Sequence, residues 1–416
     1  MNLLPDNLLP ENLLPDKRNL RIEREDFDDL FTALKQRGYS LVGPTLRNGA
    51  ILYDALNLVD DLPIGWTDVQ EAASYRIKRR DDKALFGYNV GPHSWKQFLF
   101  PPRKLLWRGK KTEDAEDVEN QSFETVVKWV DKSVDNSADN NQDITRYAFI
   151  GVRACELHAI HIQDNVFMGG VQQNSDYAGR REDNFIVAVN CGQAANTCFC
   201  TSMNTGPKVG AGYDLALTEI IDGETHYFVA QAGSEKGTAV LSDITSRSAT
   251  SIDLDNAAAC TEKAKAEMGR HIDISDIKEL LYRNYDNAQW EQLEKRCLAC
   301  GNCTMACPTC FCSKVDDVTD LTGEYAERWS TWDSCFSMDF SYIHGGSVRA
   351  STKSRYRQWL THKLATWLDQ FGSSGCVGCG RCITWCPVGI DLTAEVNAIR
   401  DSDVEVVIKS TIENKN

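Results

Sequence analysis

The sequence predicts an α+β protein in which a mixed α/β domain precedes an all-helical C-terminal domain. A strand–helix–strand pattern at residues 147–189 predicts the first domain, and helical periodicity beyond residue 275 predicts the second. We expect a flexible tail at residues 1–20, the mixed α/β domain at 21–270, the helical domain at 271–400 and a C-terminal tail at 401–416.

Composition favours a protein of the cytoplasm. The 416 residues include 60 acidic and 45 basic side chains, and the net charge of −15 disfavours nucleic-acid binding, which requires a basic patch. No stretch approaches the roughly 20 apolar residues of a membrane span. Acidic and proline residues stand where a signal peptide would have a basic region and an apolar segment. Sixteen cysteines without such a signal indicate a reducing compartment.

The N-terminal elements are predicted from local patterns. Residues 2–16 repeat a five-residue unit with a proline in each copy, which prevents a regular helix. Residues 26–37 have the apolar spacing of an amphipathic helix, and residues 39–42 and 50–56 are typical of strands. A polar, acidic region follows, with one helix predicted at residues 123–134.

The centre of the α/β domain is predicted to be a βαβ unit. Tyr147–Val152 and Phe185–Val189 are apolar runs of strand length, and residues 154–167 between them have helical spacing. Two parallel strands joined by a helix imply a layered α/β structure. Residues 215–220 and 226–230, with an Asp-Gly turn between them, predict a β-hairpin.

Two cysteine motifs dominate the C-terminal third. One runs from Cys297 to Pro308 and the other from Cys376 to Pro387, and both read C-x2-C-x2-C-x3-C-P. This spacing is typical of a [4Fe-4S] cluster, with three thiolates on one loop and the fourth cysteine directed to a second cluster. We therefore expect crossed ligation in two sets: Cys297, Cys300, Cys303 and Cys386 for cluster one, and Cys376, Cys379, Cys382 and Cys307 for cluster two.

The motifs favour clusters over two alternatives. A zinc site commonly uses two CxxC pairs, and a disulfide framework requires an oxidising compartment. Neither accounts for a fourth cysteine followed by proline in both copies. About 70 residues separate the motifs, with helical patterns at 277–282, 290–296 and 353–371, so we predict an all-helical ferredoxin-type dicluster domain rather than a compact ferredoxin. Two neighbouring clusters indicate transfer of single electrons.

Four more cysteines lie where the βαβ unit would bring them together. Cys155 and Cys191 each follow a predicted parallel strand, and Cys198 and Cys200 lie in the next loop. Sites in α/β sheets gather at the carboxyl ends of the strands. Two interpretations are open: a third iron–sulfur cluster, or four reduced thiols that pack as small hydrophobic side chains.

The remaining cysteines and the glycine-rich segment indicate no further cofactor site. We interpret Cys310, Cys312 and Cys335 as packing residues near the clusters, and Cys260 as an unrelated thiol. Residues 206–212 are glycine-rich, but their spacing does not fit a nucleotide-binding loop. We predict no catalytic residue in this chain.

Several segments together resemble a known family. They are FIGVRACELHAI at 149–160, CFCTSM at 198–203, CPTCFC at 307–312, WDSC at 332–335 and CVGCGRC at 376–382. In this order they resemble the beta subunit of cytoplasmic NiFe sulfhydrogenases, a family that includes the electron-relay subunit of anaerobic sulfite reductase. The resemblance spans about residues 25–395 and does not include the five-residue repeats.

The resemblance implies a non-catalytic relay subunit of an oxidoreductase complex. Its partners would be a diaphorase-type flavin subunit that exchanges hydride with NAD(P)H, and the small iron–sulfur and large NiFe subunits of a hydrogenase. Sulfite or polysulfide reduction is the alternative, and the partner would then be the catalytic subunit of a sulfite reductase. Two further hypotheses are a self-sufficient sulfur-reducing enzyme and a scaffold in which the clusters only hold the fold.

Overall fold

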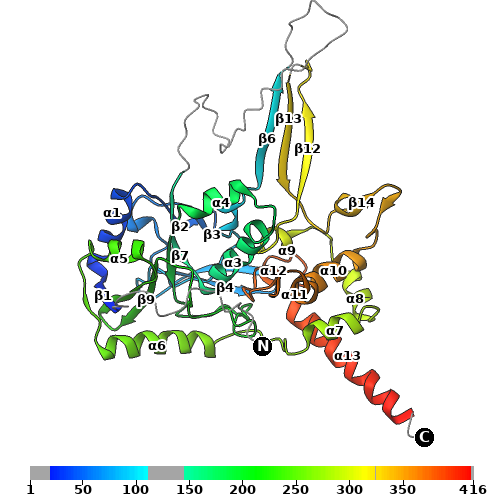
Figure 1. Ribbon diagram of the computed structural model, residues 1–416. Helices are drawn as coiled ribbons and strands as arrows, with labels where there is room; N and C mark the ends of the chain where they lie inside the picture. Colours follow the sequence, from blue (N-terminus) through cyan, green and yellow to red (C-terminus); the bar gives the residue numbers. More distant parts are fainter. Residues whose placement is uncertain (1–18, 111–144, 324, 414–416) are drawn as a thin grey trace, which may run out of the picture.

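The structure is a computed structural model that describes residues 19–110, 145–323 and 325–413 (Figure 1). The five-residue repeats at 2–16 and the helix expected at 123–134 lie outside the described residues. None of the described helices is long and apolar enough to cross a membrane.

An eight-stranded mixed sheet forms the centre of the N-terminal region, which confirms the predicted mixed α/β architecture. The neighbours β2, β7, β8 and β9 run parallel, and the remaining pairs are antiparallel. In spatial order the strands are β11 (Arg247–Ser248), β1 (Asn19–Glu23), β10 (Thr225–Ala232), β9 (Leu215–Asp222), β8 (Phe185–Val189), β7 (Tyr147–Val152), β2 (Ser40–Arg47) and β3 (Ala50–Ala55).

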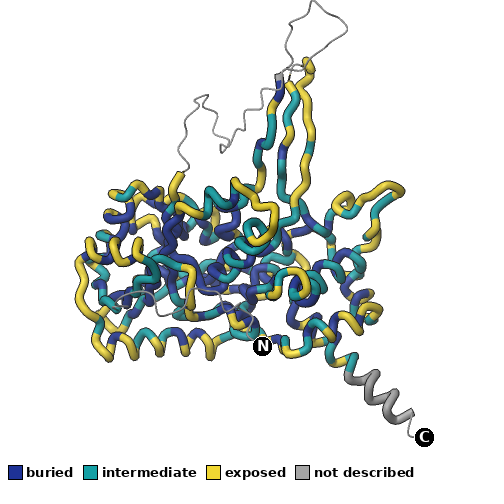
Figure 2. The backbone as a smooth tube through the Cα atoms, viewed as in Figure 1, coloured by how far each residue is buried: buried dark blue, intermediate teal, exposed yellow. Residues whose placement is uncertain are grey.

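Both faces of this sheet are covered by helices. Alternate residues of β8 contribute to two different apolar clusters, Phe185 and Val187 to one and Ile186 and Ala188 to the other. The first cluster contains the apolar side chains of α1 (Asp28–Gln36) and α5 (Glu235–Leu241). The second contains those of α3 (Ala154–Met168) and α4 (Ser175–Glu182). Continuous apolar runs such as β8 are what a strand buried on both faces requires, and all residues of β8 are buried. Figure 2 shows the centre of this region as mainly buried.

A hairpin, two helices and two 3-10 turns complete this region. They connect the sheet to the C-terminal domain or flank it, and α6 begins with a capping box in which Thr250 accepts a hydrogen bond from Asp253 N. These elements are β4 (Trp66–Glu71) and β5 (Ser74–Arg79), which form a hairpin, α2 (Lys96–Leu99), α6 (Ser251–Ala266) and the 3-10 turns η1 (Arg24–Asp26) and η2 (Val59–Asp61).

Helices surround the two cysteine motifs, and their apolar side chains share one core. The helix expected at 353–371 is present with a π-helical turn in its middle. The elements are α7 (Ile277–Arg283), α8 (Gln289–Arg296), α9 (Asn302–Met305), α10 (Thr352–Thr361), the π-helical turn η4 (His362–Thr366), α11 (Trp367–Phe371), α12 (Arg381–Thr384) and α13 (Leu392–Glu413).

The prediction that this domain is all-helical is wrong. Between the two motifs the chain forms β12 (Ser313–Thr319) and β13 (Tyr325–Trp332), and β13 also pairs with β6 (Arg103–Lys110) of the preceding region. A small hairpin of β14 (Tyr342–Ile343) and β15 (Gly346–Ser347) follows the turn η3 (Asp339–Ser341). Aromatic, valine and threonine residues favour strands here, and pairing with a strand 200 residues away is invisible to local periodicity.

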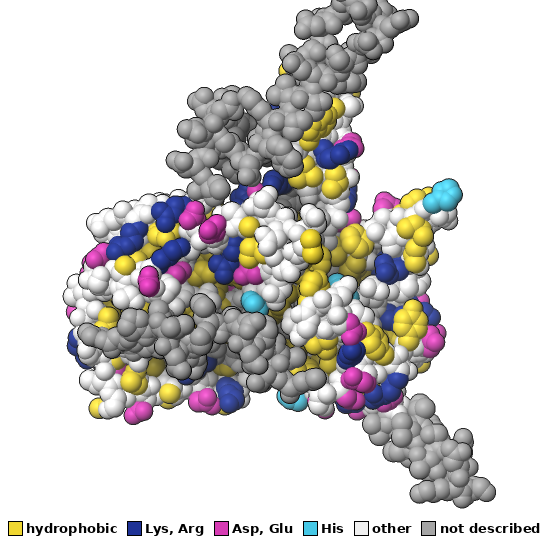
Figure 3. All heavy atoms as spheres, in the orientation of Figure 1, with side chains coloured by type: hydrophobic (Ala, Val, Ile, Leu, Met, Phe, Trp, Pro, Cys, Tyr) yellow, Lys and Arg dark blue, Asp and Glu magenta, His cyan; other side chains and the backbone are white. Residues whose placement is uncertain are grey.

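The three-stranded sheet extends from the body of the molecule as an arm (Figure 1). Its residues are mostly half-buried or exposed (Figure 2). Figure 3 shows hydrophobic side chains on the surface of the arm. Val315 and Val318 of β12 are exposed.

The helix α13 extends to Glu413, through most of the segment expected as a C-terminal tail. No glycine or proline occurs between Asp391 and Glu413, so nothing in the local sequence ends the helix earlier.

Candidate iron–sulfur site

The two motifs fold into loops with the same backbone geometry. We call residues 297–303 the first cysteine loop and residues 376–382 the second cysteine loop. In each loop the third and fifth residues have positive φ: 51° at Ala299 and 75° at Gly301, and 65° at Gly378 and 74° at Gly380. This left-handed backbone wraps the chain tightly, so that the three cysteines of a loop can converge.

The same backbone places an amide against the first sulfur of each loop. Ala299 N donates to Cys297 Sγ at 3.4 Å, and Gly378 N donates to Cys376 Sγ at 3.5 Å. A one-turn helix, α9 or α12, follows in both copies. Amide donors to cysteine sulfurs are among the groups that set the reduction potential of iron–sulfur clusters.

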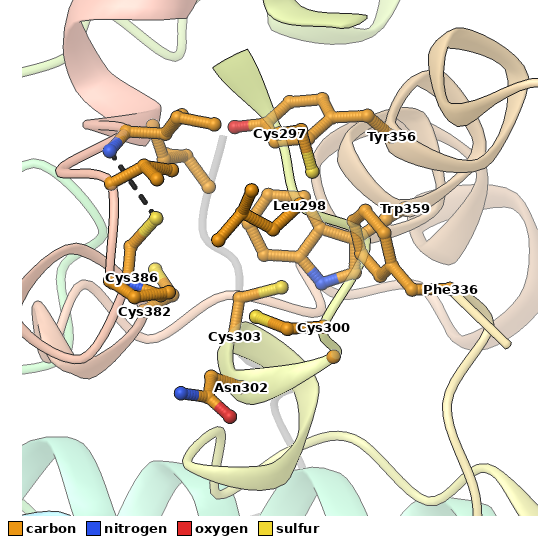
Figure 4. A pocket seen from close by; sticks show the side chains of 15 residues that line it. Cys297, Leu298, Cys300, Asn302, Cys303, Phe336, Tyr356, Trp359, Cys382 and Cys386 are labelled. Atoms are coloured by element: carbon orange, nitrogen blue, oxygen red, sulfur yellow. Dashed lines mark hydrogen bonds between the residues drawn. The ribbon is translucent and has the colours of Figure 1, made fainter.

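One cavity brings the first cysteine loop together with the end of the second motif. Its lining includes Cys297, Cys300 and Cys303 together with Cys386, while Cys307 is not part of it (Figure 4). Cys382 also lines this cavity. These five cysteines come from both motifs, so the cavity joins segments that are about 80 residues apart in sequence.

Hydrogen-bond donors surround this cavity. Ile390 N donates to Cys386 Sγ at 3.3 Å, which is the dashed line in Figure 4. The indole Nε1 of Trp359 is buried and has no hydrogen-bond partner among the described residues. Trp359 lines the cavity, where Figure 4 shows its nitrogen on the side of the Cys303 sulfur. An unpaired buried donor at a thiol-lined cavity fits a site for a group with sulfur acceptors.

Cys307 lies with the second cysteine loop instead of its own. Burial, and then the thiolates of Cys376, Cys379 and Cys307, raise the pKa of Cys382 well above its usual value. Cys307 Sγ contacts Thr309 Oγ1 at 3.1 Å, and this hydroxyl donates to Gly375 O at 2.7 Å, next to the second loop. The structure therefore brings Cys386 to the first cysteine loop and Cys307 beside Gly375, next to the second loop, while the two ligand sets stay a prediction.

A buried lysine lies against this second set. Lys363, in the π-helical turn η4, is 3 % exposed, and its Nζ is 3.1 Å from Cys307 Sγ and 3.0 Å from Thr309 Oγ1. In the described part of the chain it forms no ion pair with a carboxylate. Burial lowers the pKa of Lys363, but the thiolates of Cys307, Cys310 and Cys376 outweigh it and hold this pKa well above its usual value. A buried ammonium without a carboxylate requires an anion, and thiolates supply it.

The donor chemistry fits clusters better than a single ion. No group of three or more Cys, His, Asp or Glu side chains within the described ranges could hold one metal ion. A cube spreads its thiolate ligands over four iron atoms, each with its own bond of about 2.3 Å, so the sulfurs need not meet at a single point. Eight cysteines in two sets, with N–H donors to their sulfurs, fit two such cubes.

The third cysteine set, Cys155, Cys191, Cys198 and Cys200, also converges. All four side chains line one cavity at the edge of the eight-stranded sheet. Cys155 lies in the first turn of α3, directly after β7, and Cys191 follows the neighbouring parallel strand β8. The cavity also includes Cys379 of the second cysteine loop.

Two buried arginines flank this cavity. Arg153 donates to the carbonyl oxygens of Phe86, Tyr88 and Asn190 at 2.7, 2.8 and 3.2 Å. Arg381 forms a fully buried ion pair with Glu156 and donates to Gly91 O at 2.8 Å. Within the described residues, Arg153 Nε and Arg381 Nη1 have no hydrogen-bond partner.

The remaining cysteines are not all bystanders. Cys310 forms a hydrogen bond with Cys307, so it adjoins the second predicted set of cysteines. Cys312 forms a hydrogen bond with Cys335, which lowers the pKa of Cys312 to about 7. Cys260 lines neither cavity, and its Sγ is 3.8 Å from Glu219 O. The interpretation of Cys310, Cys312 and Cys335 as packing residues near the clusters stays a prediction.

The charged residues of the site, Arg153, Arg381 and Lys363, were not predicted from the sequence. Arg153 precedes Cys155 by two residues, and Arg381 stands inside the second motif where the first motif has Asn302. An arginine within a buried cysteine motif is the signal that could have marked Arg381. Lys363 and Trp359 carry no such signal, because their contacts depend on how α10 and η4 pack.

Comparisons with known proteins agree with this geometry. Residues 296–390 match the 4Fe-4S dicluster domain family. The chain is 26% identical to sulfhydrogenase 2 subunit beta of Pyrococcus furiosus over 392 residues, which are 92% of this chain and 99% of that protein. No solved structure matches the chain. These matches confirm the resemblance that the motifs indicate: the chain carries a 4Fe-4S dicluster domain and is similar along most of its length to a sulfhydrogenase beta subunit.

Proposed function

We propose that this chain is the electron-relay subunit of a NiFe hydrogenase complex of the sulfhydrogenase kind. It would carry single electrons between a diaphorase-type subunit, which uses flavin and NAD(P)H, and the small iron–sulfur and large NiFe subunits. The observation that carries the proposal is the pair of equivalent cysteine loops with crossed fourth cysteines, inside a chain that aligns with nearly the whole length of a sulfhydrogenase beta subunit.

The proposed ligands follow from the cysteine arrangement. Three sulfurs of each loop and the fourth cysteine of the other motif form each set. Cluster one takes Cys297, Cys300, Cys303 and Cys386, and cluster two takes Cys376, Cys379, Cys382 and Cys307. When bound, such clusters accept and release one electron at a time.

The protein's own residues give the two sites different tasks. Cys300 and Leu298 of the first cysteine loop are exposed, so this loop offers a surface where a partner protein can approach. Cys307 and Cys379 are buried, and Lys363 offsets negative charge beside them. The first loop would exchange electrons with a partner, and the second would pass them through the interior.

Sulfite or polysulfide reduction remains the alternative destination of the electrons. The same relay would serve it, because the chemistry would take place in another chain. A self-sufficient sulfur reductase requires the isolated chain to turn over polysulfide with an artificial electron donor. A scaffold requires clusters that resist reduction throughout the physiological range of potentials.

Isolation of the native complex tests the proposal. An affinity tag on this chain should recover a flavoprotein and nickel-containing hydrogenase subunits, identified by mass spectrometry and by metal and flavin analysis. The complex should couple hydrogen oxidation to NAD(P)+ reduction. Recovery of a sirohaem protein with sulfite-reducing activity would support the alternative, in which this chain is the relay subunit of a sulfite reductase. Recovery of neither kind of partner would contradict the relay proposal.

A further inference from the structure

We propose that Cys155, Cys191, Cys198 and Cys200 bind a third iron–sulfur cluster, at the edge of the eight-stranded sheet and beside the second cysteine loop. This site lies outside the dicluster domain and goes beyond the two-cluster relay proposed above. It would extend the path of electrons from the helical domain into the α/β domain.

Topology brings the four thiols together. β7 and β8 are parallel neighbours, so the residues that follow them, Cys155 and Cys191, lie at the same edge of the sheet. The loop that carries Cys198 and Cys200 folds back over this edge, and all four side chains line one cavity.

Buried positive charge distinguishes this site from four packed thiols. Arg153 lines the cavity, is 2 % exposed, donates to three carbonyl oxygens through its terminal nitrogens, and lies over the Tyr88 ring with its Cζ 4.7 Å from the ring centroid. No carboxylate of the described chain forms a salt bridge with it, and its Nε has no hydrogen-bond partner. A guanidinium buried in this state is costly unless an anion lies nearby. A cluster with four thiolate ligands is such an anion, whereas four neutral thiols are not.

Arg381 is a second buried cation, two residues after the cavity-lining Cys379, although it does not itself line the cavity. Its Nη1 is also unpaired within the described residues, although its Nη2 is ion-paired with Glu156. Tyr53 OH and Trp95 Nε1 also donate to Glu156, at 2.8 and 3.0 Å, so this carboxylate is shared among several donors. Two arginines and one carboxylate give the surroundings of the cavity a net positive charge. This charge can compensate the negative charge of a cluster.

The site is joined to the second cysteine loop by direct contacts. Phe199 N donates to Gly378 O at 2.8 Å, and Thr205 Oγ1 donates to Val377 O at 2.6 Å. A Cβ on Gly378 would lie 2.7 Å from Cys200 Cα, so only glycine allows this approach. Cys379, a proposed ligand of cluster two, lines the same cavity as the third set. The two centres would therefore be neighbours, as a relay requires.

Metal analysis of the full-length chain, purified or reconstituted without oxygen, tests this site. We expect about 12 iron and about 12 sulfide per chain, against about 8 of each for two cubanes. The variant Cys198→Ser should lose about a third of the iron and one of three reduced-cluster signals in electron paramagnetic resonance. The matched control is Cys260→Ser, because Cys260 lies near this edge of the sheet but does not line the cavity. It should keep the full iron content.

Three results would overturn the inference. About 8 iron in the wild-type chain with two clusters detected would leave the four cysteines as ordinary thiols. One zinc ion together with about 8 iron would assign the site to zinc instead. Equal iron content in Cys198→Ser and the wild type would remove these cysteines from the ligands. If Cys198→Ser does not fold, the wild-type metal count and the number of cluster signals still decide. These measurements need no partner protein, so they are independent of the proposed function.

Discussion

The first and second cysteine loops share a backbone but not an environment. Equivalent residues differ sharply: Leu298 is 63 % exposed and Val377 is 2 % exposed. Asn302 is exposed, while its counterpart Arg381 is fully buried and ion-paired with Glu156. The spacing of the cysteines sets the local geometry in both loops, and the surrounding fold decides which site meets solvent and which lies inside.

This difference gives the two cysteine loops different neighbours. The first cysteine loop faces the surface through Leu298 and Cys300, where a partner can dock. The second loop contacts the α/β domain through Gly378, and Thr384, two residues after the loop, donates to Gln70 at 2.9 Å. Loss of the interior site should interrupt the relay without disturbing chemistry in other subunits.

The substitution Cys376→Ser should have the largest effect. Serine is a poor ligand for the iron of these clusters, and Cys376 lines neither of the two cavities described above. In the proposed complex, hydrogen-dependent NAD(P)+ reduction should fall by at least about 100-fold, which corresponds to about 2.7 kcal/mol of activation free energy. Hydrogen oxidation with a dye that accepts electrons directly from the catalytic NiFe subunit should persist. Equal loss of both activities would indicate a folding defect instead of a broken relay.

Two alanine variants test whether the fourth cysteine of each motif binds the cluster of the other motif. Cys307→Ala should alter the cluster held mainly by the second cysteine loop, and Cys386→Ala the cluster held mainly by the first, because each fourth cysteine lies with the other loop. Electron paramagnetic resonance of the two reduced variants should show different signals affected. Damage confined to the cluster of the same motif in each variant would show that the ligation is not crossed.

The substitution Lys363→Met should change the interior site alone. The ammonium lies 3.1 Å from Cys307 Sγ and favours the more negative, reduced state of the cluster, so its removal should lower the reduction potential. We expect a shift of about 59 mV or more, which is a tenfold change for a one-electron couple. Redox titration followed by electron paramagnetic resonance measures it.

The matched control is Lys353→Met on α10, whose ammonium pairs with Glu291 at 3.6 Å and does not contact a cysteine. This variant should leave both potentials unchanged. A potential that rises in Lys363→Met, or that shifts only for the first site, would contradict the proposed role of Lys363.

Local patterns in the sequence were sufficient for much of this site. The cysteine spacing predicted that Cys386 would lie with the first cysteine loop, and the βαβ pattern predicted that Cys155 and Cys191 would meet at one edge of a sheet. Both inferences depend only on short-range geometry: a tight loop in one case, and two parallel strands joined by a helix in the other.

Contacts between distant segments could not be predicted in this way. The pairing of β6 with β13 changes the expected all-helical domain, and it joins residues more than 200 positions apart. The contacts of Lys363 with Cys307 and of Arg381 with Glu156 depend on how separate elements pack. A single sequence shows the charge of such residues but not their burial, so it could not show what their charges compensate.

The smallest expected effect comes from exchanging the residues at the third position of each cysteine loop. Ala299 has φ of 51°, a left-handed conformation that costs a residue with a Cβ about 1–2 kcal/mol. Ala299→Gly removes this strain but loses roughly 0.5–1 kcal/mol through greater freedom of the unfolded chain. The net change should be a stabilisation of at most about 1.5 kcal/mol, with full iron content. Gly378→Ala should behave differently, because its Cβ would meet Phe199 O at 2.6 Å as well as adopt the unfavourable φ. Thermal unfolding of the cluster-loaded chain without oxygen should show a clearly lower midpoint for Gly378→Ala and a nearly unchanged one for Ala299→Gly. Equal sensitivity of the two positions would mean that contact with the α/β domain does not distinguish the second loop from the first.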